Sequence, residues 1–328
     1  MIRLIGSACV AMRVLLLLGL ALPAGVILLT WIGCDRTSTQ EDIVAEYHYK
    51  MHGNEITITK YTGSGGVVMI PSKINGLNVT SIGDLAFGNC SNLTSIAIPK
   101  GVTSIEGEVF FGCVSLTNVI MGSSVTNIGN SAFLDCRNLT SITIPRSVAS
   151  IGNMVFEKCS NLTSITVPNG VTNIGTDAFR ECTRLTRIAI PNSVTSIGDS
   201  AFRFCSSLNN VVIPASVTSI EVGAFNGCRH LTSLTISNGI SSIGSWAFYS
   251  CTALTNIIIP NSITNIEIGA FAHCINLTSI YFNGNASSLG KDVFKDSDKA
   301  TVYYLPSATG WGKTFGGRPT ALWTRKSP

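Results

Sequence analysis

Apolar residues recur along the chain with one fixed period. Each period has a phenylalanine, then a cysteine three residues later, then a leucine three residues after that. The phenylalanines are 23 residues apart and comprise Phe87, Phe110, Phe133, Phe156, Phe179, Phe202, Phe225, Phe248, Phe271 and Phe294. The cysteines keep the same step and comprise Cys90, Cys113, Cys136, Cys159, Cys182, Cys205, Cys228, Cys251 and Cys274. A period of this length indicates a repeat protein in which each unit is one supersecondary element.

Within each unit, the pattern Leu-x-x-Ile-x-Ile alternates apolar and polar positions, which predicts a short strand. In one such strand Ile142 and Ile144 point inward, whereas Ser141 and Thr143 point outward. A proline usually follows and ends the strand ladder, because it has no N–H to donate. The next segment, Val-Thr-x-Ile-Gly-x-x-Ala-Phe, predicts an extended turn and then a short helical turn that carries the phenylalanine into the core. Its glycine predicts a bend that a Cβ would obstruct, as at Gly129, Gly152, Gly175 and Gly198.

One unit of 23 residues cannot bury its own apolar face, whereas stacked units share one continuous core. The pattern therefore predicts a repeat solenoid that is mostly β, a curved array of coils with a parallel sheet on the concave side. Short extended and helical turns are expected on the convex side. Because parallel strands stack about 4.8 Å apart, nine or ten coils give an array of roughly 45 Å.

The repeat resembles the BspA-like leucine-rich repeat family. The motifs that carry the resemblance are Ala-Phe-x-x-Cys-x-x-Leu-x-x-Ile-x-Ile-Pro and Val-Thr-x-Ile-Gly, which recur from about Ile70 to Phe294. The resemblance implies a leucine-rich-repeat solenoid without catalytic activity in a bacterial surface or secreted protein, and some members are adhesins that bind host matrix proteins. The asparagine that follows the strand in commoner leucine-rich repeats is absent here. An asparagine ladder is therefore not expected.

The N-terminal segment indicates export. Residues 1–33 carry two arginines, no acid and a stretch of 20 uncharged residues, which is typical of a signal peptide. Cys34 follows Gly33 as in a bacterial lipoprotein signal, so Cys34 is the candidate for lipidation. Twenty uncharged residues would also span a bilayer, so an uncleaved membrane anchor and simple secretion remain open. Residues 34–44 are expected to be a linker.

The flanks of the array predict caps, which cover the apolar faces of the end coils. The expected divisions are 45–70 for a strand-rich N-terminal cap, 71–296 for the leucine-rich repeat solenoid, and 297–328 for a C-terminal cap rich in aromatics and glycine. The C-terminal aromatics include Trp311, Phe315 and Trp323. We interpret them as a cover for the last coil in preference to a carbohydrate-binding platform.

The cysteine column is interpreted as a core of free thiols. The nine cysteines occupy the same place in successive coils, and cysteine is readily buried. Cβ atoms of in-register neighbours lie about 4.8 Å apart, whereas a disulfide prefers about 3.8 Å. An oxidising compartment leaves disulfides as an alternative. The spacing of cysteines and histidines does not favour a metal site, and neither a metal nor a cofactor is expected.

Composition argues against several classes of function. Only 12% of the residues are charged and 45% are hydrophobic, which is too apolar for a disordered chain. The formal net charge of +4 is small, whereas a nucleic-acid binder needs a concentrated positive field. Catalysis needs unlike groups that converge, yet most columns hold Ser, Thr, Asn or aliphatics. The column glutamates Glu106, Glu221 and Glu267 lie on coils too far apart to pair, so no enzyme is expected.

A group of arginines lies in the middle of the array. Glu157, Arg180 and Arg203 occupy one column on successive coils, and Arg184 and Arg187 lie nearby. One interpretation is a patch for an anionic or acidic partner. The favoured interpretation is a solvated ladder in which Glu157 partly neutralises Arg180, because exposed ion pairs contribute little.

The outward positions of the strands offer one continuous surface to a partner. They hold mainly small polar groups such as Thr143, Ser164 and Thr166, and Arg187 is the only charged residue among them in the nine full repeats. Arginine is a preferred anchor of interfaces. The expected function is therefore non-catalytic, adhesin-like binding of a protein or glycan outside the cytoplasm, centred on the coils around Arg187. The convex ridge is a competing face, because the column two residues before each cysteine varies more, as at Phe111, Leu134 and Tyr249.

Two other functions remain open. A structural spacer or envelope component would use the repeats only for their length. Ice or polysaccharide binding would use a threonine ladder made of Thr94, Thr117, Thr140, Thr163, Thr186, Asn209, Thr232, Thr255 and Thr278, although a curved array matches a flat lattice poorly. The expected location is the bacterial envelope outside the cytoplasm, with attachment to the membrane by an N-terminal lipid or anchor, or secretion.

Overall fold

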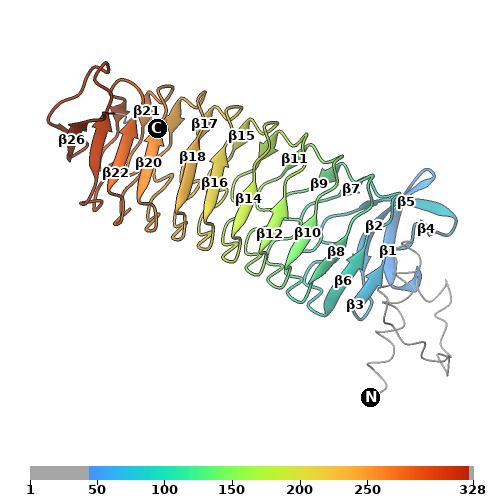
Figure 1. The fold of residues 1–328 in the computed structure, drawn as a ribbon. Coiled ribbons are helices and arrows are strands. Elements are labelled where there is room, and N and C mark those ends of the chain that lie inside the picture. The colour runs from blue at the N-terminus through green and yellow to red at the C-terminus, as the bar shows by residue number, and fades with distance from the viewer. Residues whose placement is uncertain (1–43, 325–328) are drawn as a thin grey trace, which may run out of the picture.

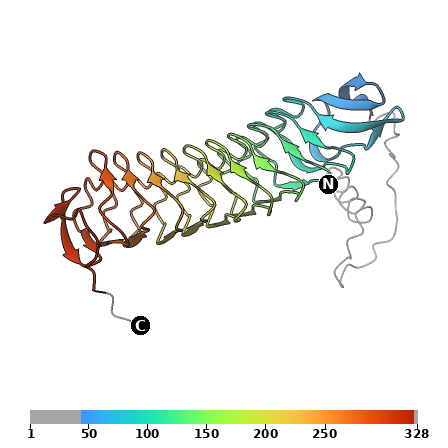
Figure 2. The same cartoon turned by 90° about the horizontal axis from the view of Figure 1, so that it is seen from above.

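The computed structural model describes residues 44–324 and shows one elongated solenoid (Figure 1). It is a mostly β array of about 11 turns of about 23 residues, with almost no helix. The N-terminal and C-terminal coils lie at opposite ends of the array, as Figure 2 shows. The fold class predicted from the 23-residue period is confirmed. The signal segment 1–33, Cys34 and nearly all of the 34–44 linker lie outside the described residues.

The main sheet takes one short strand from each coil. Its strands are β3 (Gly66–Met69), β6 (Leu93–Ala97), β8 (Asn118–Ile120), β10 (Ser141–Thr143), β12 (Ser164–Thr166), β14 (Arg187–Ala189), β16 (Asn210–Ile213), β18 (Ser233–Ile236), β20 (Asn256–Ile259), β22 (Ser279–Phe282), β24 (Thr301–Tyr304) and β26 (Arg318–Leu322). These strands are parallel and pair in the repeat register within three segments, β3 to β8, β10 to β18 and β20 to β26, so Ile142 pairs with Ile165. This is the sheet that the sequence placed on the concave side.

Side chains along each main-sheet strand alternate as the sequence predicts. Ile142 and Ile144 are buried, whereas Ser141 and Thr143 are exposed. Successive side chains of a strand point to opposite faces, so one face of the sheet covers the core and the other faces solvent. We call the second face the outer face of the main sheet.

The segment expected as an extended turn is a second, shorter parallel strand in each coil. These strands are β5 (Leu77–Ile82), β7 (Ser104–Ile105), β9 (Asn127–Ile128), β11 (Ser150–Ile151), β13 (Asn173–Ile174), β15 (Ser196–Ile197), β17 (Ser219–Ile220), β19 (Ser242–Ile243), β21 (Asn265–Ile266) and β23 (Ser288–Leu289). They follow the upper side of the array in Figure 1, where several of them are labelled. The coil therefore has two parallel strand ladders.

The expected short helical turn is instead a pair of hydrogen-bonded turns. In one coil, the N–H of Phe111 donates to the Glu108 carbonyl at 3.0 Å, and the N–H of Cys113 donates to the Phe110 carbonyl at 3.1 Å. The N–H of Phe110 points out of its own turn and donates to the carbonyl of Ala132 in the next coil at 2.8 Å. Glu108 has a left-handed φ of 55°, which a right-handed helix does not allow. The turns thus join neighbouring coils as strands do.

The core is a stack of phenylalanine rings along the array. Phe110 and Phe133 have ring centroids 5.1 Å apart with an angle of 16° between their planes, and the repeat phenylalanines from Phe133 to Phe271 stack in the same way. Tyr61 of the N-terminal cap continues the stack, 4.9 Å from Phe87. Offset stacking of buried aromatic rings stabilises the array beyond the burial of their area.

The repeat glycines let successive coils approach closely. A Cβ on Gly129 would lie 2.5 Å from the carbonyl carbon of Glu106, and a Cβ on Gly198 would lie 2.6 Å from the backbone nitrogen of Thr176. Neither glycine has a positive φ. The predicted requirement for a missing Cβ is therefore met, and its cause is the contact between coils rather than an unusual backbone angle.

Two hairpins close the ends of the array. At the N-terminus β1 (Tyr47–His52) pairs antiparallel with β2 (Glu55–Tyr61), and β2 then pairs in parallel with β5. The short β4 (Lys73–Ile74) folds back antiparallel on β5. At the C-terminus β25 (Thr314–Phe315) pairs antiparallel with β26. The two end coils of the core are thus covered by the chain itself.

The aromatic residues of the C-terminal cap divide into two groups. Trp311 stacks on Tyr304 with centroids 5.0 Å apart, and both Trp311 and Phe315 contact the ring of Phe282 at the end of the core. Trp323 does not join them but lies 4.9 Å from Tyr281 on the outer face of the main sheet. Only the first group covers the last coil.

Candidate functional site

The outer face of the main sheet has a depression over β12, β14 and β16. Its volume is about 530 Å³, and its lining residues are Ser164, Ile165, Thr166, Arg187, Ile188, Ala189, Ile190, Asn210 and Val212. Ile165 and Ile188 are almost completely buried, so they contribute an apolar floor. Arg187, Thr166 and Asn210 are exposed polar groups around it. An apolar surface with a few convergent polar groups is typical of a binding site.

Strand pairing is shorter on one side of the depression than on the other. β12 and β14 pair at three positions, whereas β14 and β16 pair only at Arg187 and Asn210. In the adjacent outward column, Ala189 contributes only a methyl group between the larger Thr166 and Val212. The shorter pairing and the small side chain together lower the surface at β14.

The structure separates the four arginines that the sequence places in the middle of the array. Arg187 is exposed, and within residues 44–324 it has no ion-pair partner. Arg184 donates from Nη1 to Oδ1 of Asn161 at 3.0 Å. The guanidinium of Arg203 lies over the ring of Phe204, 4.8 Å from its centroid. Arg187 is therefore the arginine best placed to meet a partner.

Arg180 is neutralised by three carboxylates. Its guanidinium lies 3.6 Å from Glu157, 3.4 Å from Glu181 and 3.9 Å from Asp177. Partial burial raises the pKa of the Glu157 carboxyl, while the positive charge of Arg180 opposes that shift. The 23-residue step in the sequence identifies only Glu157 as a partner of Arg180. Asp177 and Glu181 reach Arg180 through the geometry of the turn, which the step does not reveal. This geometry favours a neutralised ladder over an anion patch, but Glu157 is buried, so the ladder is less solvated than the sequence predicted.

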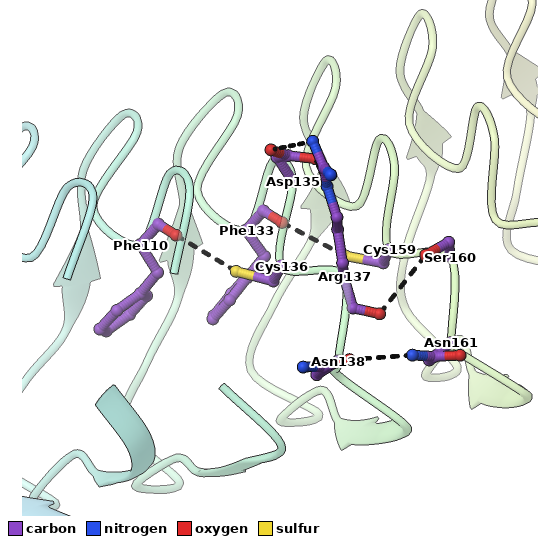
Figure 3. A network of polar contacts seen from close by, with 9 residues as sticks. All are labelled: Phe110, Phe133, Asp135, Cys136, Arg137, Asn138, Cys159, Ser160 and Asn161. Atoms are coloured by element: carbon purple, nitrogen blue, oxygen red, sulfur yellow. Dashed lines mark hydrogen bonds and ion pairs between the residues drawn. The ribbon is translucent and has the colours of Figure 1, made fainter. Parts of the chain in front are cut away.

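The cysteines form a hydrogen-bonded ladder inside the core (Figure 3). The thiol of Cys136 donates to the carbonyl of Phe110 at 3.2 Å, and the thiol of Cys159 donates to that of Phe133 at 3.2 Å. Eight cysteines make this contact with the preceding coil, at 3.1–3.4 Å. Cys90 begins the ladder and is partly exposed, and all nine cysteines are free thiols in the structure.

Burial keeps these thiols protonated. It raises the pKa of Cys113 and Cys274 to about 12. A thiol is reactive and ligates metal as the thiolate, so groups with such pKa values are inert near neutral pH. The column therefore serves the core of the array.

The threonine ladder is also used by the fold. The hydroxyl of Thr117 donates to the Thr94 carbonyl at 3.0 Å, and that of Thr186 donates to the Thr163 carbonyl at 3.2 Å. Similar bonds join Thr163 to Thr140 and Thr278 to Thr255. These hydroxyl protons are bonded within the fold, so donation to a crystalline ligand would have to replace those bonds.

The three column glutamates also make local contacts. Ser104 donates to Glu106 at 2.6 Å, Ser219 donates to Glu221, and Ser245 donates to Glu267 at 3.0 Å. Across residues 44–324, His, Cys, Asp and Glu nowhere form a group of three or more that could hold a metal ion. In the same range, no helix has the length and apolar character needed to cross a membrane.

Comparison with known proteins agrees with this architecture. The sequence model of the family described as BspA type leucine-rich repeat region (6 copies) matches residues 80–209 and 172–301 of this chain. A leucine-rich repeat protein from Bacteroides ovatus is 29% identical, with a TM-score of 0.70, over 79% of this chain and 70% of that protein. A leucine rich cell surface protein from Faecalibacterium prausnitzii is 27% identical, with a TM-score of 0.51, over 86% of this chain and 94% of that protein.

The pneumococcal vaccine antigen PcpA has the same fold at 23% identity, with a TM-score of 0.52 over 79% of each chain. No curated protein matches the sequence. The matched repeats cover well over half of the chain and carry its phenylalanine, cysteine and leucine columns. The chain therefore belongs to the BspA-type leucine-rich repeat family.

Proposed function

We propose that the chain is a non-catalytic, adhesin-like protein that binds an acidic protein partner on the outer face of the main sheet around Arg187. The observation that carries this proposal is the depression of about 530 Å³ beside an exposed arginine that has no ion-pair partner within residues 44–324. A guanidinium can bind a carboxylate through two parallel hydrogen bonds, and the apolar floor can hold a side chain next to it. Ser164, Thr166 and Asn210 add neutral hydrogen-bonding groups.

We also propose that the protein acts outside the cytoplasm, attached to the bacterial envelope. One structural neighbour is described as a cell surface protein, and the N-terminal segment is typical of an export signal. Attachment would use a lipid on Cys34.

The test measures binding of the protein to a panel of immobilised extracellular matrix proteins. Arg187→Glu should weaken binding by about tenfold or more, because the anchor is replaced by a charge that repels an acidic partner. Ala189→Trp should have a similar effect, since it fills the depression without changing the charge. Arg229→Glu is the matched control, because Arg229 is an equally exposed arginine on the turn after Cys228.

Two results would contradict the proposal. Equal binding by folded wild type and both variants would place the interface elsewhere. Absence of binding to the whole panel would favour a spacer that uses the repeats only for length.

A further inference from the structure

Aromatic side chains gather on the outer face of the main sheet at its C-terminal end. Tyr281 of β22 and Tyr303 of β24 are in register, and their rings stack with centroids 5.0 Å apart and an angle of 21° between planes. The ring of Trp323 lies 4.9 Å from that of Tyr281, tilted by 46°. Ile258, in the preceding strand of the same column, is about half exposed. These four residues make one apolar and aromatic strip.

The strip does not belong to the core. Ile280, Phe282 and Val302 alternate with the two tyrosines along the strands and are buried, so Tyr281 and Tyr303 point to the opposite face. The rings that cover the last coil are those of Trp311 and Phe315. Tyr281 and Tyr303 therefore face solvent on the outer face of the main sheet, and the parallel register holds their rings in fixed positions.

The outward positions of the strands that carry the strip are uncharged. The outward positions of β20, β22 and β24 hold Asn256, Ile258, Ser279, Tyr281, Thr301 and Tyr303. Tyr303 pairs with Ala321 of the next strand, so the column of large side chains ends at Tyr303. Neutral amide and hydroxyl groups next to rigid aromatic rings can hydrogen-bond a ligand that also has an apolar face.

We propose that this strip is a binding site for a neutral glycan. A pyranose ring has an apolar C–H face, which can stack on an aromatic ring, and hydroxyl groups at its edge, which need neutral donors and acceptors. An acidic glycan or peptide would need a cation, and these six outward positions have none. The site lies four coils from Arg187, or about 19 Å along the array. It goes beyond the proposed protein-binding function and does not depend on it.

The test uses the full-length protein on an array of neutral and acidic glycans. Affinity electrophoresis in gels that contain the best neutral polysaccharide then compares variants. Tyr281→Ala and Trp323→Ala should each weaken binding by about tenfold, because each removes one ring of the strip. Trp246→Ala is the matched control, because Trp246 is 46% exposed and lies in the turn segment, away from the main sheet. Its binding should equal that of the wild type.

Three outcomes would overturn the proposal. One is no binding to any neutral glycan of the array by wild-type protein. Another is unchanged binding by both aromatic variants while circular dichroism shows them folded. The third is binding restricted to acidic glycans and lost in Arg187→Glu, which would assign glycan recognition to the depression at β14. Failure of the Arg187 variants alone leaves this site intact, so the two proposals are tested separately.

Discussion

At the scale of single residues, the cysteine column shows what a repeat position selects. The sequence identifies the cysteines as small residues in an apolar column, and the structure adds a hydrogen bond from each buried thiol to a phenylalanine carbonyl. Ser297 occupies the next place after Cys274 and makes the same contact with Phe271, at 2.8 Å. The position therefore selects a small side chain that can donate a hydrogen bond.

This view changes the expected effect of substitutions at Cys182. A hydroxyl in an apolar column without a partner would cost about 1–3 kcal/mol. The Phe156 carbonyl, which lies 3.1 Å from the sulfur of Cys182, can accept a hydrogen bond from a serine hydroxyl at this position. Cys182→Ser should therefore lower the free energy of unfolding by about 1 kcal/mol. Cys182→Val should lower it by about 2 kcal/mol, since valine is larger and cannot donate. Urea unfolding followed by circular dichroism measures both, and a valine variant as stable as the serine variant would show that the hydrogen bond is unimportant.

Residue types alone could not predict the state of the arginines. The column of Glu157, Arg180 and Arg203 is visible in the sequence, because it follows the 23-residue step. Asp177 and Glu181 reach Arg180 only through the left-handed turn positions that flank it in its own coil. Whether an arginine is free or paired thus depends on turn geometry, which the repeat pattern does not encode.

At the scale of elements, the main strands were predictable and the turns were not. Alternation of apolar and polar residues over Ser141–Thr143 identifies the strand and both of its faces. The turn positions are occupied by residues as different as Glu108, Met154 and Trp246, all with positive φ. Left-handed positions are usually recognised from glycine or asparagine, so this variety hides the two turns and makes a helical turn the natural expectation. The depression at β14 also needs the three-dimensional pairing, because an alanine in one outward position is unremarkable in sequence.

The C-terminal cap provides a prediction about an element. Trp311 packs against Tyr304, Phe282 and Phe315 at the open end of the core. Trp311→Ala should destabilise the last coils by about 2–3 kcal/mol, because it exposes the rings of Phe282 and Tyr304 at the end of the core. Hydrogen exchange should then be faster in β24 and β26 than in wild type, while β10 to β16 keep their protection. Trp246→Ala serves as a control that removes an exposed indole, and faster exchange along the whole array would show that the cap is not a local element.

At the scale of the whole molecule, the array is a rigid support for separate surface features. Each coil contacts only its neighbours, so a change in one outward side chain leaves distant coils unaltered. The core columns are nearly invariant from Phe87 to Phe294, whereas the outward positions change from Ser and Thr to Arg187 and then to the aromatic strip. The parts that keep the fold and the parts proposed to meet partners are thus different residues of the same coils.

The prediction for the whole chain concerns Cys34, which lies outside the described residues. The Gly33-Cys34 junction after 20 uncharged residues predicts lipidation of its sulfur. Stable attachment takes more than one acyl chain, so a protein lipidated at Cys34 should sediment with membranes. In bacteria grown with a clickable fatty acid, wild type and the control Cys90→Ala should be labelled, whereas Cys34→Ala should be unlabelled. Equal labelling of Cys34→Ala, or an intact N-terminus found by mass spectrometry of the wild type, would instead support an uncleaved anchor for the array.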